Sequence, residues 1–222
     1  HYILNGEKVF ITNGGWADVF TVFAKVDGDK FSAFIVELGT PGFEIGPEEH
    51  KMGMKGSSTT SLIFKDAKVP AENLLYEVGK GATIAFNALN MGRYKLAASD
   101  LGGCKIIITE AAQYALQRRQ FGQPIAHFDA IKGKFADMII GAYSADSMIY
   151  RTIGLIQDEI DTIDKNDDKY YIKVGEAMER YAIEASMSKV YGSETFGKVA
   201  DHGIQILGGY GLRAEKYSCI TG

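Results

Sequence analysis

An aromatic ring, a hydroxyl and two glycines follow one another closely in Phe10-Ile11-Thr12-Asn13-Gly14-Gly15. The commonest interpretation of such a run is a strand that ends in a turn. The same residues could bind the planar ring of a redox cofactor. Phe10 would then lie beside its flat face, and the Thr12 hydroxyl would donate a hydrogen bond to its edge. A flavin needs such a donor at N5, because hydride delivery there builds negative charge.

A second segment, Arg118-Arg119-Gln120-Phe121-Gly122, lies where two long stretches of helical periodicity meet. Cations at a helix C-terminus complement the helix dipole, which gives the arginines a structural explanation. That explanation does not account for the Gln-Phe-Gly-Gln-Pro-Ile that follows them. Because a bidentate guanidinium suits a pyrophosphate, Arg118 together with Phe121 could hold the adenosine end of a dinucleotide.

The third segment is Gln205-Ile206-Leu207-Gly208-Gly209-Tyr210-Gly211. Two glycines after a helix most often cap its C-terminus. They also allow the backbone to approach a ligand closely, because no Cβ stands in the way. The segment is not a dinucleotide fingerprint of the Rossmann type, since there the helix follows the glycines, whereas here it precedes them.

Composition sets limits on the class of protein. The chain has 222 residues, of which 46% are hydrophobic and 23% charged, enough for one large core or two smaller ones. The net charge of −4 gives no electrostatic reason to expect nucleic acid or an anionic membrane surface as a partner. No apolar run approaches the ~20 residues that a transmembrane helix needs.

The cysteines and the first residues bear on localisation. Cys104 and Cys219 are far apart and outside any metal-ligand spacing, so we expect no metal site and a reduced, cytoplasmic setting. His1 opens a strand-like run and not a charged leader, so we expect no signal peptide. We interpret this start as an internal position of a longer protein.

The first 70 residues alternate short apolar runs with turn residues. Strands are expected at residues 2–4, 9–12, 17–26, 31–38 and 59–64. Asn5-Gly6 and Asp27-Gly28-Asp29-Lys30 are both typical of hairpin turns. Four or five antiparallel strands in so short a stretch predict a small barrel or an orthogonal sandwich.

After Pro70 the apolar residues recur every three or four positions. The spacing predicts a helix of about 35 residues that contains residues 86–115, or roughly 50 Å at the usual rise. Gly122-Gln123-Pro124 should end it. A second helix of similar length is expected over residues 128–156, and the polar residues 158–169 should form an exposed loop or an extended helix end.

A third helix should carry Met178 to Lys189, a break is expected at Gly192-Ser193, and a short fourth helix should run to about Leu207. Such long helices usually pack as an antiparallel bundle. The predicted fold class is therefore α+β, with an antiparallel β-barrel or sandwich domain (1–75) followed by a long-helix bundle (76–222).

Seven stretches together resemble the acyl-CoA dehydrogenase family, over residues 1–211. The residues of these stretches are most similar to those of the very-long-chain branch and its bacterial relatives. The stretches are residues 3–8 and 10–15, Lys51-Met52-Gly53-Met54-Lys55-Gly56-Ser57-Ser58-Thr59-Thr60, Val69-Pro70-Ala71-Glu72-Asn73, Asn90-Met91-Gly92-Arg93, and residues 118–125 and 205–211.

The resemblance implies a middle β-domain packed on a C-terminal four-helix domain, within a homodimer or homotetramer that binds FAD between these domains. It also implies that the first part of the β-domain and the last helix of the bundle are missing from this chain. The implied chemistry is α,β-dehydrogenation of an acyl-CoA: a base removes the α-proton, and hydride passes from the β-carbon to flavin N5. An electron-transfer flavoprotein is the expected electron acceptor.

The resemblance also assigns roles to residues. Phe10, Ile11 and Thr12 would contact the flavin, and Ser57-Ser58-Thr59-Thr60 would open a strand near the active site. The residues expected to reach the FAD of a neighbouring subunit are Arg118, Gln205, Ile206, Leu207, Gly208 and Gly209, and Phe121 is also expected to bind the cofactor. Those expected to line the acyl-CoA pocket are Asn90, Met91, Gly92 and Arg93.

Three departures from the family pattern limit these roles. Phe10 replaces the commoner tryptophan, although the stacking face is kept. Asp129 stands where many members have a glutamine that contacts FAD, and its carboxylate would repel a pyrophosphate. No catalytic base is assigned: a minority of members carry it at the position of Gly92, and Glu215 comes too soon after the glycines to match the usual glutamate.

We therefore expect this chain alone to be inactive towards acyl-CoA. Two alternatives stay open at this point. One is a non-catalytic binding or assembly module with the same fold, and the other is an acyl-CoA oxidase, in which oxygen reaches the reduced flavin.

Overall fold

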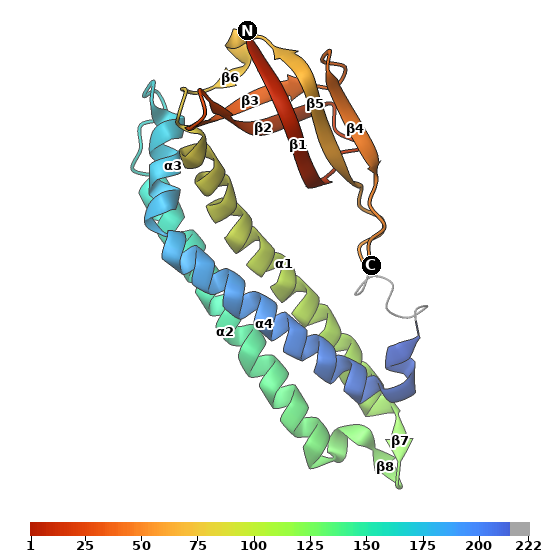
Figure 1. Cartoon of the computed structure of the whole chain (residues 1–222). Coiled ribbons are helices and arrows are strands. Elements are labelled where there is room, and N and C mark those ends of the chain that lie inside the picture. Colours follow the sequence, from red (N-terminus) through yellow and green to blue (C-terminus); the bar gives the residue numbers. More distant parts are fainter. Residues whose placement is uncertain (214–222) are drawn as a thin grey trace. The chain divides into compact units, whose positions relative to one another are not determined.

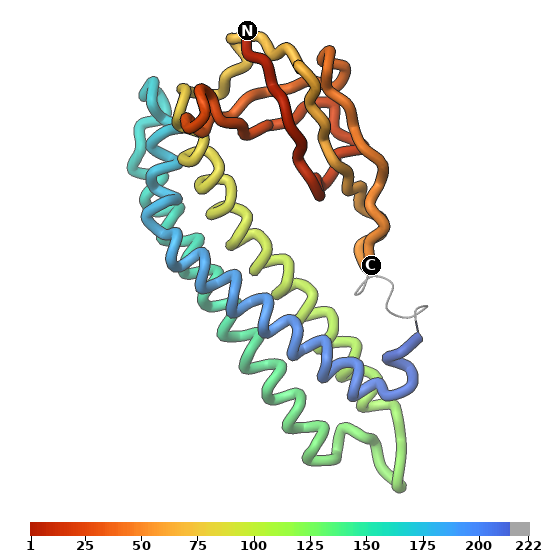
Figure 2. The backbone as a smooth tube through the Cα atoms, viewed as in Figure 1, coloured from red at the N-terminus to blue at the C-terminus, as the bar shows by residue number. Residues whose placement is uncertain are grey.

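The computed structural model describes residues 1–213 (Figures 1 and 2). Its first part is a β-unit of two three-stranded antiparallel sheets. One sheet has the order β1-β5-β4, and the other has the order β2-β3-β6. The strands are β1 (Tyr2–Thr12), β2 (Val19–Val26), β3 (Lys30–Glu37), β4 (Phe43–Glu48), β5 (Thr59–Val69) and β6 (Leu74–Leu75). Five strands thus lie within the first 69 residues, as predicted.

The core of the β-unit is formed by the alternate side chains that both sheets turn inward. Phe43 stacks on Phe64 with their ring centroids 5.0 Å apart, and the edge of Phe20 lies against Phe43. Val22, Phe34 and other residues of the opposite sheet complete the same cluster. Aromatic and β-branched residues at every second position form such a sheet-on-sheet core. The predicted fold class is confirmed.

The hairpin predicted at Asn5-Gly6 is wrong, because β1 continues straight through these residues. The side chain of Asn5 accepts a hydrogen bond from the Asp66 N–H at 2.8 Å and donates one to the Asp66 carboxylate at 3.0 Å. The strand pairing shifts register at this point, which indicates a bulge in β5 at Asp66. The asparagine therefore fills a gap in the ladder and does not turn the chain. β4, with few apolar residues, was not predicted.

The second predicted hairpin is confirmed. Val26 pairs with Lys30, and the chain reverses through Asp27 and Gly28, which both have positive φ.

Four helices follow: α1 (Gly81–Gln117), α2 (Asp129–Ile160), α3 (Tyr170–Arg180) and α4 (Ala182–Leu207). The two long helices predicted from the spacing are confirmed. Shorter elements join them, namely η1 (Ala71–Asn73), β7 (Arg119–Gln120), β8 (Gln123–Pro124), η2 (Ile125–His127) and η3 (Gly208–Leu212).

The break predicted at Gly192-Ser193 is wrong, because α4 runs through it and the helix is interrupted at Tyr181 instead. A Cβ at Gly192 would lie 3.2 Å from both Cα and Cβ of Ala97 on α1. A Cβ at Gly203 would lie only 2.5 Å from Ile107. These glycines therefore let α4 approach α1 closely within the helical core, and they do not interrupt the helix.

That helical core is built largely from small side chains of α1, α2 and α4, with Met138 and Ile149 among the larger ones. Cys104 is buried in it, and burial, with the Asp100 carboxylate nearby, raises the pKa of its thiol to about 11. Cys219 and Glu215 lie outside the described residues.

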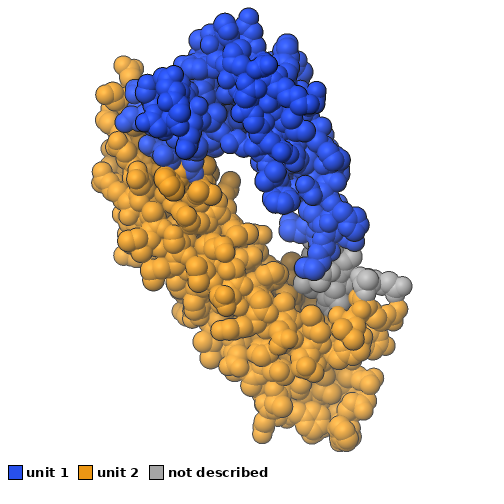
Figure 3. Space-filling view, in the orientation of Figure 1, with its two compact units in different colours: residues 1–85, 221–222 blue, residues 86–220 orange. Residues whose placement is uncertain are grey.

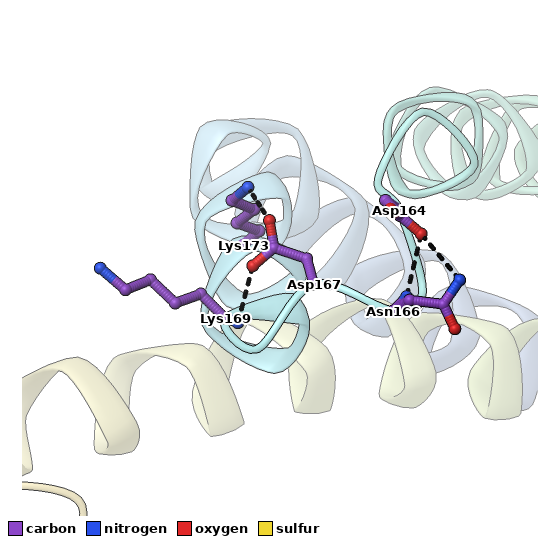
Figure 4. Close-up of polar contacts among 5 residues, drawn as sticks. All are labelled: Asp164, Asn166, Asp167, Lys169 and Lys173. Atoms are coloured by element: carbon purple, nitrogen blue, oxygen red, sulfur yellow. Dashed lines mark hydrogen bonds and ion pairs between the residues drawn. The ribbon is translucent and has the colours of Figure 1, made fainter.

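The segment between α2 and α3 is a turn held by aspartates (Figure 4). Asp164 accepts hydrogen bonds from the backbone and side chain of Asn166. Asp167 accepts one from the Lys169 N–H at 2.7 Å and pairs with the Lys173 ammonium, which brings a carboxylate to the N-terminus of α3. Of the two alternatives left open for residues 158–169, the loop after Ile160 is therefore confirmed.

The chain divides into two compact units, which Figure 3 colours separately. One contains residues 1–85, and the second begins at Phe86. The domain limits expected from the sequence, 1–75 and 76–222, stay a prediction. Within the described residues, no helix is both long enough and apolar enough to cross a membrane.

Candidate functional site

One pocket of about 450 Å³ lies at the end of the helical unit where α1 ends and α4 ends. Its walls come from three stretches of chain that are distant in sequence. The lining residues are Tyr114, Arg118, Gln120, Ile125, Ile206, Leu207, Gly208, Gly209, Tyr210 and Arg213.

The β7–β8 hairpin fixes the approach of Arg118 to this pocket. Phe121 and Gly122 both have positive φ, which is the geometry of a tight two-residue hairpin turn. The Arg118 N–H donates to the Tyr114 carbonyl at 2.8 Å, and the Arg118 carbonyl accepts from the Ile125 N–H at 2.8 Å. The backbone on both sides of Arg118 is therefore held, while its guanidinium is at the pocket wall.

The other wall is formed where α4 ends. Gly208, with φ +55 and ψ −129, ends the helix, and its N–H donates to the carbonyls of Ile204 and Gln205. A Cβ at Gly211 would lie 2.7 Å from the Ile204 carbonyl oxygen, so that glycine is required by packing. A Cβ at Gly209 would meet nothing within 4 Å. Packing among the described residues thus gives no reason for a glycine at 209, which leaves room for an external group.

The structure brings together five of the residues predicted from two separate segments: Arg118, Ile206, Leu207, Gly208 and Gly209. It does not place Gln205 or Phe121 among the lining residues. Phe121 lies at the hairpin tip, 92% exposed, with its ring edge-on to Phe128 at 6.2 Å. Whether these residues contact a cofactor stays a prediction.

Sequence reasoning missed the aromatic part of this pocket. Tyr114 and Tyr210 lie with their ring centroids 5.8 Å apart, and the Arg213 guanidinium lies 6.0 Å from the Tyr210 ring. A signal was present for Tyr114, since it precedes Arg118 by four residues and therefore lies on the same helix face. Tyr210 was inside the glycine segment but was not singled out.

In the β-unit, two of the three residues predicted to contact a flavin, Phe10 and Thr12, are exposed to solvent. Lys8 pairs with Leu62 and Ile11 with Thr60, so two residues of β1 stand opposite one residue of β5. At this bulge Phe10 has φ +57 and is 68% exposed. Ile11 packs against the β-core, whereas Thr12 is exposed. A bulky residue in the left-handed region is strained, and such strain is often found at functional sites.

The turn after Thr12 packs tightly against the start of β5. The Asn13 N–H donates to the Ser58 carbonyl at 3.0 Å, and the Gly15 N–H donates to the Ser58 hydroxyl at 2.9 Å. A Cβ at Gly14 would lie 2.2 Å from Oγ1 of the buried Thr60. Gly14 is therefore needed for this close approach.

The β-unit has a pocket of about 420 Å³ beside this turn. It is lined by Trp16, Glu48, Glu49, His50, Lys51, Lys55, Ser57 and Ser58. The Ser58 hydroxyl, and then the Thr59 N–H, hold the pKa of the Glu48 carboxyl below its usual value, with a further contribution from Lys51. The sequence had given no reason to single out Glu48.

The four residues predicted to line an acyl-CoA pocket differ in exposure and in hydrogen bonding. Asn90 is only 3% exposed, and its side-chain amide oxygen accepts a hydrogen bond from the Arg93 guanidinium at 2.5 Å. Met91 is half-buried. Gly92 is exposed, and a Cβ there would meet nothing within 4 Å. Asn90 therefore orients Arg93, and Gly92 offers space but no functional group.

Asp129 begins α2 and pairs with Lys132 at 3.0 Å. The pair is exposed, so it offsets the negative charge only partly.

Comparison with known proteins agrees with this architecture. Residues 1–67 match the family model for the acyl-CoA dehydrogenase middle domain, and residues 79–220 match the model for the acyl-CoA dehydrogenase C-terminal domain. The chain belongs to the acyl-CoA dehydrogenase family. The resemblance inferred from the seven sequence stretches is confirmed.

A curated relative from Bacillus subtilis, named probable acyl-CoA dehydrogenase, is 53% identical over 97% of this chain and 36% of its own length. The very long-chain specific acyl-CoA dehydrogenase of Macaca fascicularis is 41% identical over 97% of this chain and 32% of its own length. The chain thus spans about a third of each of these relatives.

A crystal structure of an acyl-CoA dehydrogenase complexed with FAD, from Bacillus anthracis, superposes with a TM-score of 0.93. It is 52% identical to this chain and covers 97% of it, and the match covers 37% of that protein.

Proposed function

We propose that this chain is the flavin-holding part of an enzyme that oxidises an acyl-CoA thioester to its α,β-unsaturated product. The observation that carries the proposal is the pocket in which Arg118 meets Gly208 and Gly209. Family membership supports it, as does the FAD that the Bacillus anthracis relative binds.

The residues present fit FAD in three respects. Arg118 brings a guanidinium to a pocket wall, where it can pair with a pyrophosphate. Gly209 leaves space that no other described residue fills. Phe10 presents an exposed ring beside the exposed Thr12, which suits the flat face and the polar edge of an isoalloxazine.

FAD, when bound, supplies the acceptor for the hydride that leaves the β-carbon. The protein's own residues position the flavin and neutralise the charge of its phosphates. In this proposal the Thr12 hydroxyl donates a hydrogen bond at the N5 edge, Phe10 excludes water from one side of the ring, and Arg118 offsets the phosphate charge. We further propose that the pocket beside Arg118 receives the FAD of a second subunit, within a homodimer or homotetramer.

The residue that removes the α-proton is not assigned. Gly92 has no side chain that could accept a proton, and we propose that the chain by itself does not catalyse the reaction. Dehydrogenation leaves two electrons on the flavin, which must be passed on. In this proposal an electron-transfer flavoprotein in the cytoplasm accepts them.

A flavin absorbance spectrum tests the proposal. The purified protein should bind FAD, and addition of a long-chain acyl-CoA to the full-length enzyme should bleach the oxidised flavin band. A protein that binds no FAD refutes the proposal. Bound FAD that no acyl-CoA bleaches, in the full-length protein, favours the non-catalytic module. Rapid reaction of the reduced protein with oxygen favours the oxidase.

A further inference from the structure

A relay of hydrogen bonds joins the end of β4 to the turn after Thr12. The Ser58 hydroxyl donates to one carboxylate oxygen of Glu48 at 2.5 Å, and the Thr59 N–H donates to the other at 2.9 Å. The Ser58 hydroxyl oxygen in turn accepts from the Gly15 N–H at 2.9 Å. A hydroxyl has one hydrogen to donate. The carboxylate therefore fixes the direction of that hydrogen and leaves a lone pair for Gly15.

The space around Gly15 is occupied by the same two side chains. A Cβ at this position would lie 2.6 Å from Oε1 of Glu48 and 2.7 Å from Oγ of Ser58. No side chain larger than hydrogen fits without moving one of them. The relay in this arrangement therefore requires a glycine at position 15.

A cation also binds the start of β5 and the residues before it. The Lys51 ammonium donates to the Ser57 carbonyl at 2.6 Å and to the Thr59 hydroxyl at 2.9 Å. These contacts hold residues 57–59, to which the relay is attached. Glu48 itself is exposed, so its ion pairing is screened by water, but charge-assisted hydrogen bonds remain stronger than neutral ones.

We propose that Glu48 is a positioning residue, which acts through Ser58 to hold the Asn13-Gly14-Gly15 turn and thereby sets the place of the Thr12 hydroxyl. Thr12 is directly paired with Thr59, so both ends of this short segment are tied to the start of β5. The consequence for the flavin rests on the proposed function, whereas the relay itself does not.

Hydrogen exchange tests the relay in the whole protein, with or without FAD. Ser58→Ala removes the acceptor of the Gly15 N–H, and exchange of that amide should become about tenfold faster. Glu48→Ala should accelerate it about threefold, because the serine keeps its oxygen but loses its orientation. Glu48→Gln keeps one acceptor oxygen and should fall between Glu48→Ala and the unaltered protein. The double variant should exchange no faster than Ser58→Ala alone.

Glu49→Ala is the matched control. Glu49 is the adjacent exposed carboxylate, and only its backbone N–H is bonded to β5. This variant should leave exchange at Gly15 unchanged. Equal exchange in Glu48→Ala and Glu49→Ala overturns the proposal.

The flavin's reduction potential tests the consequence at Thr12. In the FAD-loaded protein, Glu48→Ala should shift the reduction potential in the same direction as Thr12→Val, since both disturb the same hydrogen bond at the N5 edge. A potential that changes in Thr12→Val but not in Glu48→Ala overturns the proposed positioning role. If the unaltered protein binds no FAD, the proposed function fails, while the exchange rates still decide whether the relay holds the turn.

Discussion

The two candidate regions, one in the β-unit and one in the helical unit, are held in place by different means. In the β-unit, side chains add to the backbone hydrogen bond between Asn13 and Ser58 in holding the turn after Thr12: the Ser58 hydroxyl bonds to the turn and to the Glu48 carboxylate, and Thr60 packs against the turn. In the helical unit, backbone hydrogen bonds hold Arg118 and the end of α4, at a hairpin and at a helix terminus. A site held by side chains can be altered by substitutions that do not touch the ligand. A site held by backbone tolerates such substitutions but depends on glycine and on turn geometry.

The largest expected effect compares two glycines. Gly14→Ala places a methyl group 2.2 Å from Thr60 Oγ1 and should destabilise the β-unit by about 3 kcal/mol. Gly209→Ala meets nothing within 4 Å, so it should change the free energy of unfolding by less than about 0.5 kcal/mol while weakening FAD binding. Urea titration and FAD titration of both variants measure these differences. Equal destabilisation by the two substitutions would contradict the distinction between the two regions.

The next effect concerns Arg118. Arg118→Ala should weaken FAD binding by about 1.5–3 kcal/mol, the usual contribution of a charge-assisted contact. Arg119→Ala is the control, because the Arg119 guanidinium donates to the Gly122 carbonyl within its own hairpin. FAD affinity is measured by fluorescence titration at several protein concentrations. Full affinity in a strict monomer would show that no second subunit contributes.

A smaller effect is expected for Thr12→Val, which keeps the β-branched shape and removes the hydroxyl. In the full-length enzyme, flavin reduction should slow about tenfold, the equivalent of one hydrogen bond, with little change in stability. Stopped-flow absorbance and thermal unfolding measure the two quantities. A melting temperature that falls by several degrees with normal reduction would make Thr12 structural.

The smallest effect lies in the helical unit, where a side chain holds a turn. The Lys173 side chain and then the Lys169 N–H hold the pKa of Asp167 below its usual value. Since the folded-state pKa is the lower one, the stabilisation is present above the unfolded value of ~4 and is lost as pH falls through the folded pKa. Asp167→Asn should therefore reduce the acid sensitivity of α3, measured by circular dichroism from neutral to strongly acidic pH. Unchanged acid unfolding would show that Asp167 adds nothing to the turn.

Local patterns predicted the elements whose cause is local. The long helices followed from apolar spacing, and the hairpin at Asp27-Gly28 followed from turn residues. Predictions failed where a residue's partner lies far away in sequence. Asn5 bonds to Asp66 and Gly192 packs against Ala97, so an apparent turn and an apparent helix break were neither.

The same reasoning applies to the candidate site. The sequence singled out Arg118 and the Gly208-Gly209 pair, and the structure places them in one pocket, although their roles remain to be tested. It could not indicate Glu48, whose part depends on a hydroxyl ten positions further on and a turn on another strand. It also could not show that Asn90 is engaged with Arg93 inside the helical unit, since that bond depends on the rotamers of both side chains.

Trp16 lies directly after the Asn13-Gly14-Gly15 turn and lines the same pocket as Glu48 and Ser58. It is the only tryptophan of the sequence. The indole emission of these 222 residues therefore arises from this one place in the β-unit. Its wavelength follows the solvation of the turn, and its intensity falls when an acceptor chromophore lies within energy-transfer range. The protein thus contains its own optical probe of the region where the flavin edge is proposed to bind, with no label attached.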